Sequence, residues 1–300
     1  MRNEMWIPIT LAAATFQILR TSRQHRLRSI LSVNAAGFVR YAYGFPLAML
    51  ATVVTFGAFR ADLPTIPARF WLIIAGGGIA QIIGTIALLR SFDLRDFAIG
   101  TVYSKTEIVI VAVASAVLLG ESLRPAGWIA AFMCMVGVAW LAARGDLRSA
   151  LHNSLDPAAW MGIAAAAGFA LAAIGIRAAS TSLGDASAWS RAILTLTVML
   201  GIQTVLNGAQ LAVIDKPAMV AVAHHWRAAL PVGILSICGS TGWAVAVTLT
   251  SATKVRTLGQ VELVMAFAIS ALWLHERHKP KEYAASALVL IGVVGVVALG

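Results

Sequence analysis

The stretch TEIVIVAVASAVLLGESLRP, residues 106–125, returns 155 positions later as VELVMAFAISALWLHERHKP, residues 261–280. Each copy places a glutamate, Glu107 or Glu262, just inside an apolar run, and a second glutamate fourteen residues further on. A carboxylate inside a membrane is costly, so it usually faces a cavity or a partner. The two stretches therefore predict a duplicated membrane protein with an ionisable residue in each half.

The duplication continues into the next apolar segment. Residues 107–143 align with residues 262–298 without a gap. Matched alanines, valines and leucines mean little in so apolar a chain, whereas the matched glutamates and the matched Pro125 and Pro280 mean more. The alignment indicates two copies of one structural unit.

Composition determines the class of protein. Apolar residues make up 59% of the chain and charged residues 12%, whereas a soluble domain has roughly 45–50% and about 25%. Residues 45–59, 108–119 and 284–299 contain no charge at all. Because a helix satisfies its own backbone hydrogen bonds in lipid, the sequence predicts an all-α polytopic membrane protein.

The net charge of +10 does not indicate nucleic-acid binding. The arginines are scattered over the junctions between apolar segments instead of forming one basic face with interleaved aromatic residues. We interpret them as borders of membrane segments that meet anionic lipid head groups. Membrane lipids are therefore expected partners, and nucleic acid is not.

Ten segments are long enough to cross a bilayer, which requires about 20 helical residues. Clusters of Arg, Asp, Pro and Gly separate them, and the longest polar junction, residues 144–156, divides the chain into a first repeat (1–145) and a second repeat (155–300). The predicted segments are 4–21, 33–58, 69–90, 97–119, 126–143, 157–178, 187–213, 228–250, 257–275 and 282–299.

Five segments in each half is an odd number, which has a topological consequence. The second copy of an odd-numbered unit must enter the membrane upside down, so we expect two inverted five-helix repeats related by an axis in the membrane plane. This architecture is typical of secondary transporters, whose binding site lies near the midplane between the repeats.

The motif that ends the first stretch resembles the drug/metabolite transporter superfamily, and in particular its EamA-type family. Leu118-Leu119-Gly120-Glu121-Ser122-Leu123 fits that branch closely, whereas Leu274-His275-Glu276-Arg277 replaces the glycine with histidine. The proline that family members usually carry thirteen residues before the terminal glutamate is absent, because Ile108 and Leu263 stand there. The resemblance covers nearly the whole chain and implies a bacterial inner-membrane transporter, commonly an exporter.

Glu107 lies about 20 Å of helix rise from Glu121, well inside the bilayer if Glu121 marks the interface. Two interpretations remain open for Glu107: a proton carrier, or a fixed ion pair with an arginine such as Arg40 or Arg191. Lys105 points to nearly the opposite side of the helix, so it cannot easily pair with Glu107, and we expect it to reach toward the interface.

Other polar side chains within apolar segments are candidates for binding substrate or a coupling ion. Interhelical hydrogen bonds are the competing explanation for the glutamines, and core packing is the competing explanation for the tryptophan. Glu262 has Gln260 where Glu107 has Lys105, so the two copies differ chemically. The candidate substrate- and ion-binding residues are Glu107, Tyr103, Arg40, Gln17, Gln81, Glu262, Arg191 and Trp243.

No motif indicates catalysis, a cofactor or a metal. The chain has no HExxH and no phosphate-binding GxxxxGK[ST] loop. Cys134 and Cys238 lie in apolar segments, where a cysteine acts as a small hydrophobe. Glu121 and Glu276 are expected to end helices. We therefore expect no catalytic residue, no metal site and no cofactor.

Two lines of reasoning give opposite orientations of the chain in the membrane. Arg20, Arg23, Arg26 and Arg28 crowd the first junction, so the positive-inside rule places that junction in the cytoplasm. The family resemblance implies cytoplasmic termini instead, although part of the cluster can belong to an extended first helix. The orientation stays open between these two.

These observations predict a secondary active transporter of small metabolites such as amino acids, drugs or organic cations. We expect an exporter that works by alternating access, with protons as a coupling ion, acting as a monomer or homodimer. The alternatives are a facilitative uptake carrier and a lipid-scramblase-like membrane protein; an intramembrane enzyme lacks the motifs it would need.

Overall fold

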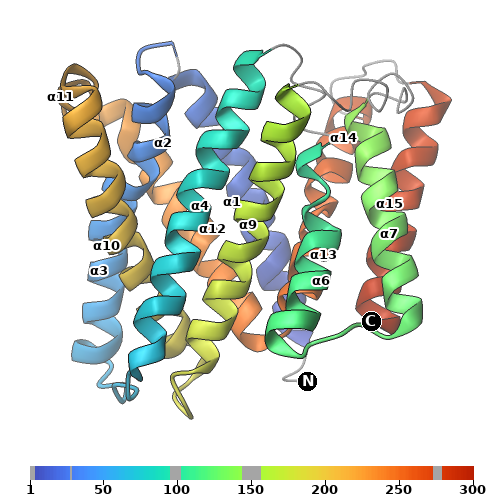
Figure 1. Cartoon of the computed structure of the whole chain (residues 1–300), viewed down its shortest axis with the longest axis horizontal. Helices are drawn as coiled ribbons and strands as arrows, with labels where there is room; N and C mark the ends of the chain where they lie inside the picture. Colours follow the sequence, from blue (N-terminus) through green and yellow to red (C-terminus); the bar gives the residue numbers. More distant parts are fainter. Residues whose placement is uncertain (1–3, 28, 95–102, 144–156, 273–278) are drawn as a thin grey trace. The chain divides into compact units, whose positions relative to one another are not determined.

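The structure is a computed structural model that describes residues 4–27, 29–94, 103–143, 157–272 and 279–300. Every regular element within these residues is a helix (Figure 1). The predicted all-α class is therefore confirmed. The terminal motif around Glu276 and the junction at residues 144–156 lie outside the described residues.

Seven described stretches are long and apolar enough to cross a bilayer. They agree with seven of the ten predicted segments to within a few residues. These are Val33–Ala58, Ala68–Ser91, Pro125–Ala142, Pro157–Thr181, Ala188–Ile214, Trp226–Leu249 and Pro280–Leu299. The structure also contains a short helix that the sequence did not predict, α11 (Lys216–His224).

The described parts of the three remaining predicted segments are largely helical, but none of them is long and apolar enough to count as a candidate span. The segment at 4–21 is α1 (Trp6–Leu27), which continues through Arg20, Arg23 and Arg26 and is therefore less apolar than predicted. The segments at 97–119 and 257–275 contain helices that begin or break at polar residues. A count of ten spanning helices thus stays a prediction.

The chain folds into two compact units, and each combines residues from both predicted repeats. The first unit consists of residues 1–82 and 172–250. In it, α1 packs on α12, and α10 packs on α2, α3 and α12. Besides α1 and α11, its helices are α2 (Val33–Ala42), α3 (Gly44–Val53), α10 (Ala188–Ile214) and α12 (Trp226–Leu249), with parts of α4 (Ala68–Leu94) and α9 (Pro157–Thr181).

The second unit consists of residues 83–171 and 251–300. In it, α7 packs along α15, and α13 packs on α6. Its helices are α6 (Glu107–Leu119), α7 (Pro125–Ala142), α13 (Ala252–Gly259), α14 (Val261–Leu272) and α15 (Pro280–Leu299), with the remaining parts of α4 and α9.

Local sequence signals explain where several helices begin and end. Pro125 and Pro280 occupy the first turns of α7 and α15, where the missing backbone N–H is no loss. The Ser251 hydroxyl accepts from Lys254 N and caps α13. Helix α6 ends at Gly120, whose φ of 68° suits a residue without a side chain. Glu121 follows this cap, in agreement with its predicted position at a helix end.

Proline also explains why the second predicted segment is not one regular helix. The pyrrolidine nitrogen of Pro46 cannot donate to the carbonyl of Ala42, one turn earlier. Helix α2 ends at Ala42, and α3 begins at Gly44. Further on, residues Val54–Ala58 form a π-helical turn. The segment remains continuous enough to count as a single candidate span.

Helices α7 and α15 approach each other closely and in opposite directions (Figure 1). A Cβ on Gly292 would lie 2.5 Å from Cys134 N, and a Cβ on Gly137 would lie 2.7 Å from Val289 N. Gly137 aligns with Gly292 and Cys134 with Val289 at the offset of 155. The contact is therefore reciprocal and antiparallel, as a pair of inverted repeats requires, although the inverted repeat of the whole chain stays a prediction.

Candidate functional site

Glu107 is a buried carboxylate at the start of α6, with 6% of its surface exposed. Arg256 of α13 donates from Nε to Glu107 Oε1 at 2.6 Å, and its Nη2 contacts the same oxygen. The structure thus gives Glu107 an arginine partner, as expected if Glu107 forms an ion pair. The partner is Arg256, and not Arg40 or Arg191 as the sequence suggested.

A second ion pair lies in the same unit. Lys105 Nζ is 3.6 Å from Glu262 Oε1, and both side chains are largely shielded, with 14% and 16% exposed. From the sequence we expected Lys105 to reach toward the interface. The structure instead gives it a charged partner, Glu262. As predicted, it does not pair with Glu107, its near neighbour in the chain.

The two ion pairs are crossed between the halves of the sequence. In one, the glutamate comes from the first half and the cation from the second; in the other, the glutamate comes from the second half and the cation from the first. Opposite charges in a low-dielectric environment attract strongly and neutralise each other. We call Lys105, Glu107, Arg256 and Glu262 the charged cluster.

Both helices are interrupted beside the charged cluster. Tyr103 and Ser104 form a helical turn that is separated from α6 by a turn at Lys105 and Thr106, and Gln260 separates α13 from α14. Lys105 and Gln260 are equivalent at the offset of 155. Interrupted membrane helices expose backbone polar groups, and in transporters they often form the substrate or ion site.

Buried oxygen atoms surround these interruptions. Thr253 and Thr257 lie one turn apart on one face of α13, and Gln260 caps the end of this helix three residues later. Their Oγ1, Oγ1 and Oε1 atoms are buried and have no hydrogen-bond partner within the part of the chain that the structure describes. The same holds for Tyr103 Oη, a predicted site atom. Buried polar atoms without partners often mark sites of bound water or ions.

The sequence did not identify Arg256, Thr253, Thr257 or Gln260 as site residues. Arg256 aligns with Thr101, so comparison of the two copies gives no sign of a conserved arginine position. The predicted segment at 257–275 also began one residue too late to include it. The available signal was only that a charged residue, Arg256, lies six positions before Glu262 in the sequence.

Two of the predicted residues form a hydrogen bond in the first unit. Trp243 Nε1 donates to Gln17 Oε1 at 3.1 Å, joining α12 to α1. Nearby along α12, Gly242 lets α1 approach, because a Cβ there would lie 2.8 Å from the Cβ of Ala13. The structure therefore places Gln17 and Trp243 in one interhelical contact.

Gln81 has a similar role in the same unit. It accepts from Gln203 Nε2 at 2.8 Å, and Gln203 Nε2 also donates to the carbonyl of Gly78 at 3.2 Å. Gln203 is fully buried. These bonds join α10 to α4, which is the interhelical explanation that the sequence left open for such residues.

Replacing Gln203 with leucine is expected to lower the free energy of unfolding by about 0.5–1.5 kcal/mol, because two interhelical hydrogen bonds disappear. Unfolding in sodium dodecyl sulfate measures the effect. Thr204→Val is the control, since Thr204 Oγ1 bonds only within its own helix, to Leu200 O. Equal losses in both variants would show that the bonds of Gln203 do not join the helices.

The two predicted arginines differ from each other. Arg40 is 6% exposed in the last turn of α2, and its guanidinium lies 5.1 Å from the ring centre of Tyr41. Arg191 is only partly buried and donates from Nη1 to Gly184 O at 3.3 Å. Arg191 therefore fixes the loop before α10, whereas Arg40 lies within the unit.

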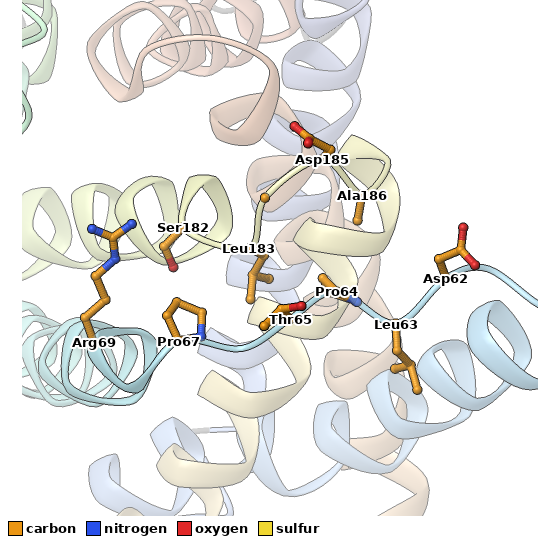
Figure 2. A pocket seen from close by; sticks show the side chains of 11 residues that line it. Asp62, Leu63, Pro64, Thr65, Pro67, Arg69, Ser182, Leu183, Asp185 and Ala186 are labelled. Atoms are coloured by element: carbon orange, nitrogen blue, oxygen red, sulfur yellow. The ribbon is translucent and has the colours of Figure 1, made fainter.

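A cavity of about 610 Å³ opens in the first unit between the connections that precede α4 and α10. Figure 2 shows Arg69 at one end and Asp62 at the other. The connections at residues 62–67 and 182–187 lie at the ends of candidate membrane spans. None of the predicted site residues lines this cavity.

Comparison with known proteins now identifies the family. Residues 156–298 match the model of the EamA-like transporter family. The second half of this chain belongs to the EamA-like transporter family. That family is part of the drug/metabolite transporter superfamily, so the resemblance seen in the sequence is confirmed. The EamA assignment indicates a multi-pass membrane transporter and gives no indication of an enzyme.

The fold of the whole chain also has a known counterpart. A solved crystal structure aligns with 99% of this chain and 98% of its own, with a TM-score of 0.74 and 15% sequence identity. At that identity the likeness concerns the fold alone. No curated protein matches the sequence. The first half therefore takes part in a known fold although the family model covers only the second.

Proposed function

We propose that this protein is a secondary active transporter of small metabolites that works by alternating access and couples substrate movement to protons. The observation that carries the proposal is the crossed arrangement of Glu107–Arg256 and Lys105–Glu262. Each ion pair links a helix of one sequence half to a helix of the other. Such links can be broken and remade as two repeats move around a fixed site.

Glu107 is the group on which a proton would act. Its ionised carboxylate accepts charge-assisted hydrogen bonds from Arg256. A proton taken up on Glu107 from one side of the membrane removes that negative charge and weakens the hold on the guanidinium, so that α6 and α13 are free to separate. Release of the proton to the other side restores the ion pair and returns the helices to contact.

The second glutamate has a different setting. Lys105 Nζ stands 3.6 Å from Glu262, whereas Arg256 holds Glu107 through two nitrogens. A lysine ammonium is a point charge, and arginine is a planar fork that fits a carboxylate. We therefore assign proton coupling to Glu107 and a positioning role to Glu262.

The family match of residues 156–298 supports the remaining parts of the proposal. They are export from the cytoplasm across a bacterial inner membrane, by a monomer or homodimer, of amino acids, drugs or organic cations. Burial of the charged cluster also fits the general tendency of intramembrane ionisable residues to mark substrate or proton pathways.

Transport by the purified chain in proteoliposomes tests the proposal. Vesicles loaded with a panel of amino acids and organic cations are placed in a pH gradient, and substrate loss and internal pH are followed together. We expect at least one compound to leave faster with a gradient than without one, with a matching pH change. Movement that ignores the gradient would favour a facilitative carrier, and movement of labelled lipid alone would favour a scramblase.

A further inference from the structure

Arg40 is a buried cation that has no acidic partner among the residues that the structure describes. Its side chain is 6% exposed, and its Nε is buried without an acceptor. Its side chain makes no hydrogen bond or ion pair with any described residue. It makes a cation–π contact with the ring of Tyr41. A guanidinium carries five N–H donors and no acceptor, so a large hydrogen-bonding capacity is unused.

Neither nearby source of stabilisation supplies acceptors for this group. The carbonyl end of α2 is favourable for a cation, because Arg40 lies in its last turn. The face of an aromatic ring is also favourable for a guanidinium. Both effects lower the electrostatic penalty, but a buried donor that is left without an acceptor still destabilises the protein.

The acidic residues of the first unit are not placed to neutralise Arg40. The unit contains Glu4, Asp62, Asp185 and Asp215, all of which lie at or beyond helix ends. Asp215 caps α11 by accepting from Ala218 N. The interior of the unit therefore has an arginine and no carboxylate.

Arg20 lies on the neighbouring helix α1 and has an interaction partner of its own. Gln24 Nε2 of α1 donates to Ala36 O of α2 at 2.7 Å. Arg20 lies one turn before Gln24, and Arg40 lies one turn after Ala36, so both are on the helix faces that meet at this bond. Neither α1 nor α2 contains an acidic residue.

Arg191 shares part of this feature, because its Nε is also buried without an acceptor among the described residues. Arg191 lies early in α10, 151 positions after Arg40; it differs from Arg40 in being more exposed and in donating from Nη1 to Gly184 O. One arginine of the sequence pair stabilises a loop, and the other is held inside the first unit with its donors available.

We propose that Arg40 is the subsite for an oxyanion, and that the cargo carries a carboxylate or phosphoryl group. A planar guanidinium binds two oxygens of either group side by side. Amino acids and other zwitterions satisfy this requirement, whereas organic cations without an oxyanion do not. The inference rests on the proposed transport function only in taking the bound anion to be part of the cargo.

Anion binding is measured on the purified full chain in detergent. Thermal unfolding is followed by tryptophan fluorescence in malonate, in inorganic phosphate and in chloride at equal ionic strength. We expect malonate or phosphate to raise the unfolding temperature saturably above the chloride value, and the more effective anion identifies the preferred group. In Arg40→Gln this difference disappears, and in Arg40→Lys the apparent Kd rises because the planar fork is lost.

Arg191→Gln is the matched control and should keep the full anion effect. Folding of Arg40→Gln is checked by its unfolding temperature in chloride, which should equal or exceed that of the wild type because an uncompensated buried charge has been removed. An unchanged anion effect in folded Arg40→Gln, or its loss in Arg191→Gln, would overturn the assignment.

Failure of this inference and failure of the transport proposal give different results. Transport of neutral or cationic compounds only, without an anion effect, removes the role of Arg40 and leaves the transporter. A saturable anion effect that depends on Arg40, in a protein that moves no compound, supports the subsite and removes the transporter.

Discussion

Replacing Glu107 with glutamine is expected to abolish pH-dependent transport. Glutamine keeps the shape of the side chain but neither takes up nor releases a proton in the physiological range. It also leaves Arg256 without its counter-charge, and breaking a buried ion pair on one side typically destabilises a protein by about 3–5 kcal/mol. Transport at several pH values and unfolding in sodium dodecyl sulfate measure the two effects separately.

The variant with both Glu107→Gln and Arg256→Gln separates coupling from stability. Because no unpaired charge remains, its free energy of unfolding should recover much of the loss seen in the single variant. Its transport should still not respond to pH. Glu262→Gln is the matched control from the equivalent position, and it should retain the pH response. A normal pH response in the folded double variant would rule out Glu107 as the proton carrier.

The membrane class and most helix positions could be predicted from the sequence because they depend on local properties. Long apolar runs form helices in lipid, and prolines such as Pro125 and Pro280 mark their first turns. The break at Tyr43 follows equally locally from Pro46. Helix α11 was missed because it has only nine residues, too few to cross a bilayer.

The partners of the charged residues depend on tertiary packing and could not be predicted. The position of Glu107 inside an apolar run was enough to make it a candidate. Nothing local indicates that α13 packs on α6 and brings Arg256 to it. The repeat even obscures this arginine, because Thr101 occupies the equivalent place.

Similar positions in the two repeats do not guarantee similar surroundings for the side chains. Arg40 and Arg191 occupy similar positions in their segments, yet one is buried and the other fixes a loop. Gln17 and Gln81 were candidates for binding substrate, and the structure gives each an interhelical hydrogen bond. Burial and pairing arise from which helices meet, and a repeat in sequence does not determine them residue by residue.

Replacing Gly292 with alanine is expected to destabilise the protein by about 1–3 kcal/mol, as overpacking of a close contact usually does. The new Cβ would lie 2.5 Å from Cys134 N and 2.7 Å from Cys134 Cα, so α7 and α15 must move apart. Both neighbours are backbone atoms, which cannot rotate away as the end of a flexible side chain can. Unfolding in sodium dodecyl sulfate gives the change in free energy.

Gly76→Ala is the matched control, because a Cβ at Gly76 of α4 meets nothing within 4 Å. Alanine favours a helix over glycine by roughly 0.5–1 kcal/mol, so this variant should be as stable as the wild type or slightly more stable. Gly137→Ala, at the position equivalent to Gly292, should behave like Gly292→Ala because it faces Val289 N at 2.7 Å. If the packing is reciprocal, both variants must lose stability. A loss of stability in Gly292→Ala with none in Gly137→Ala would contradict it.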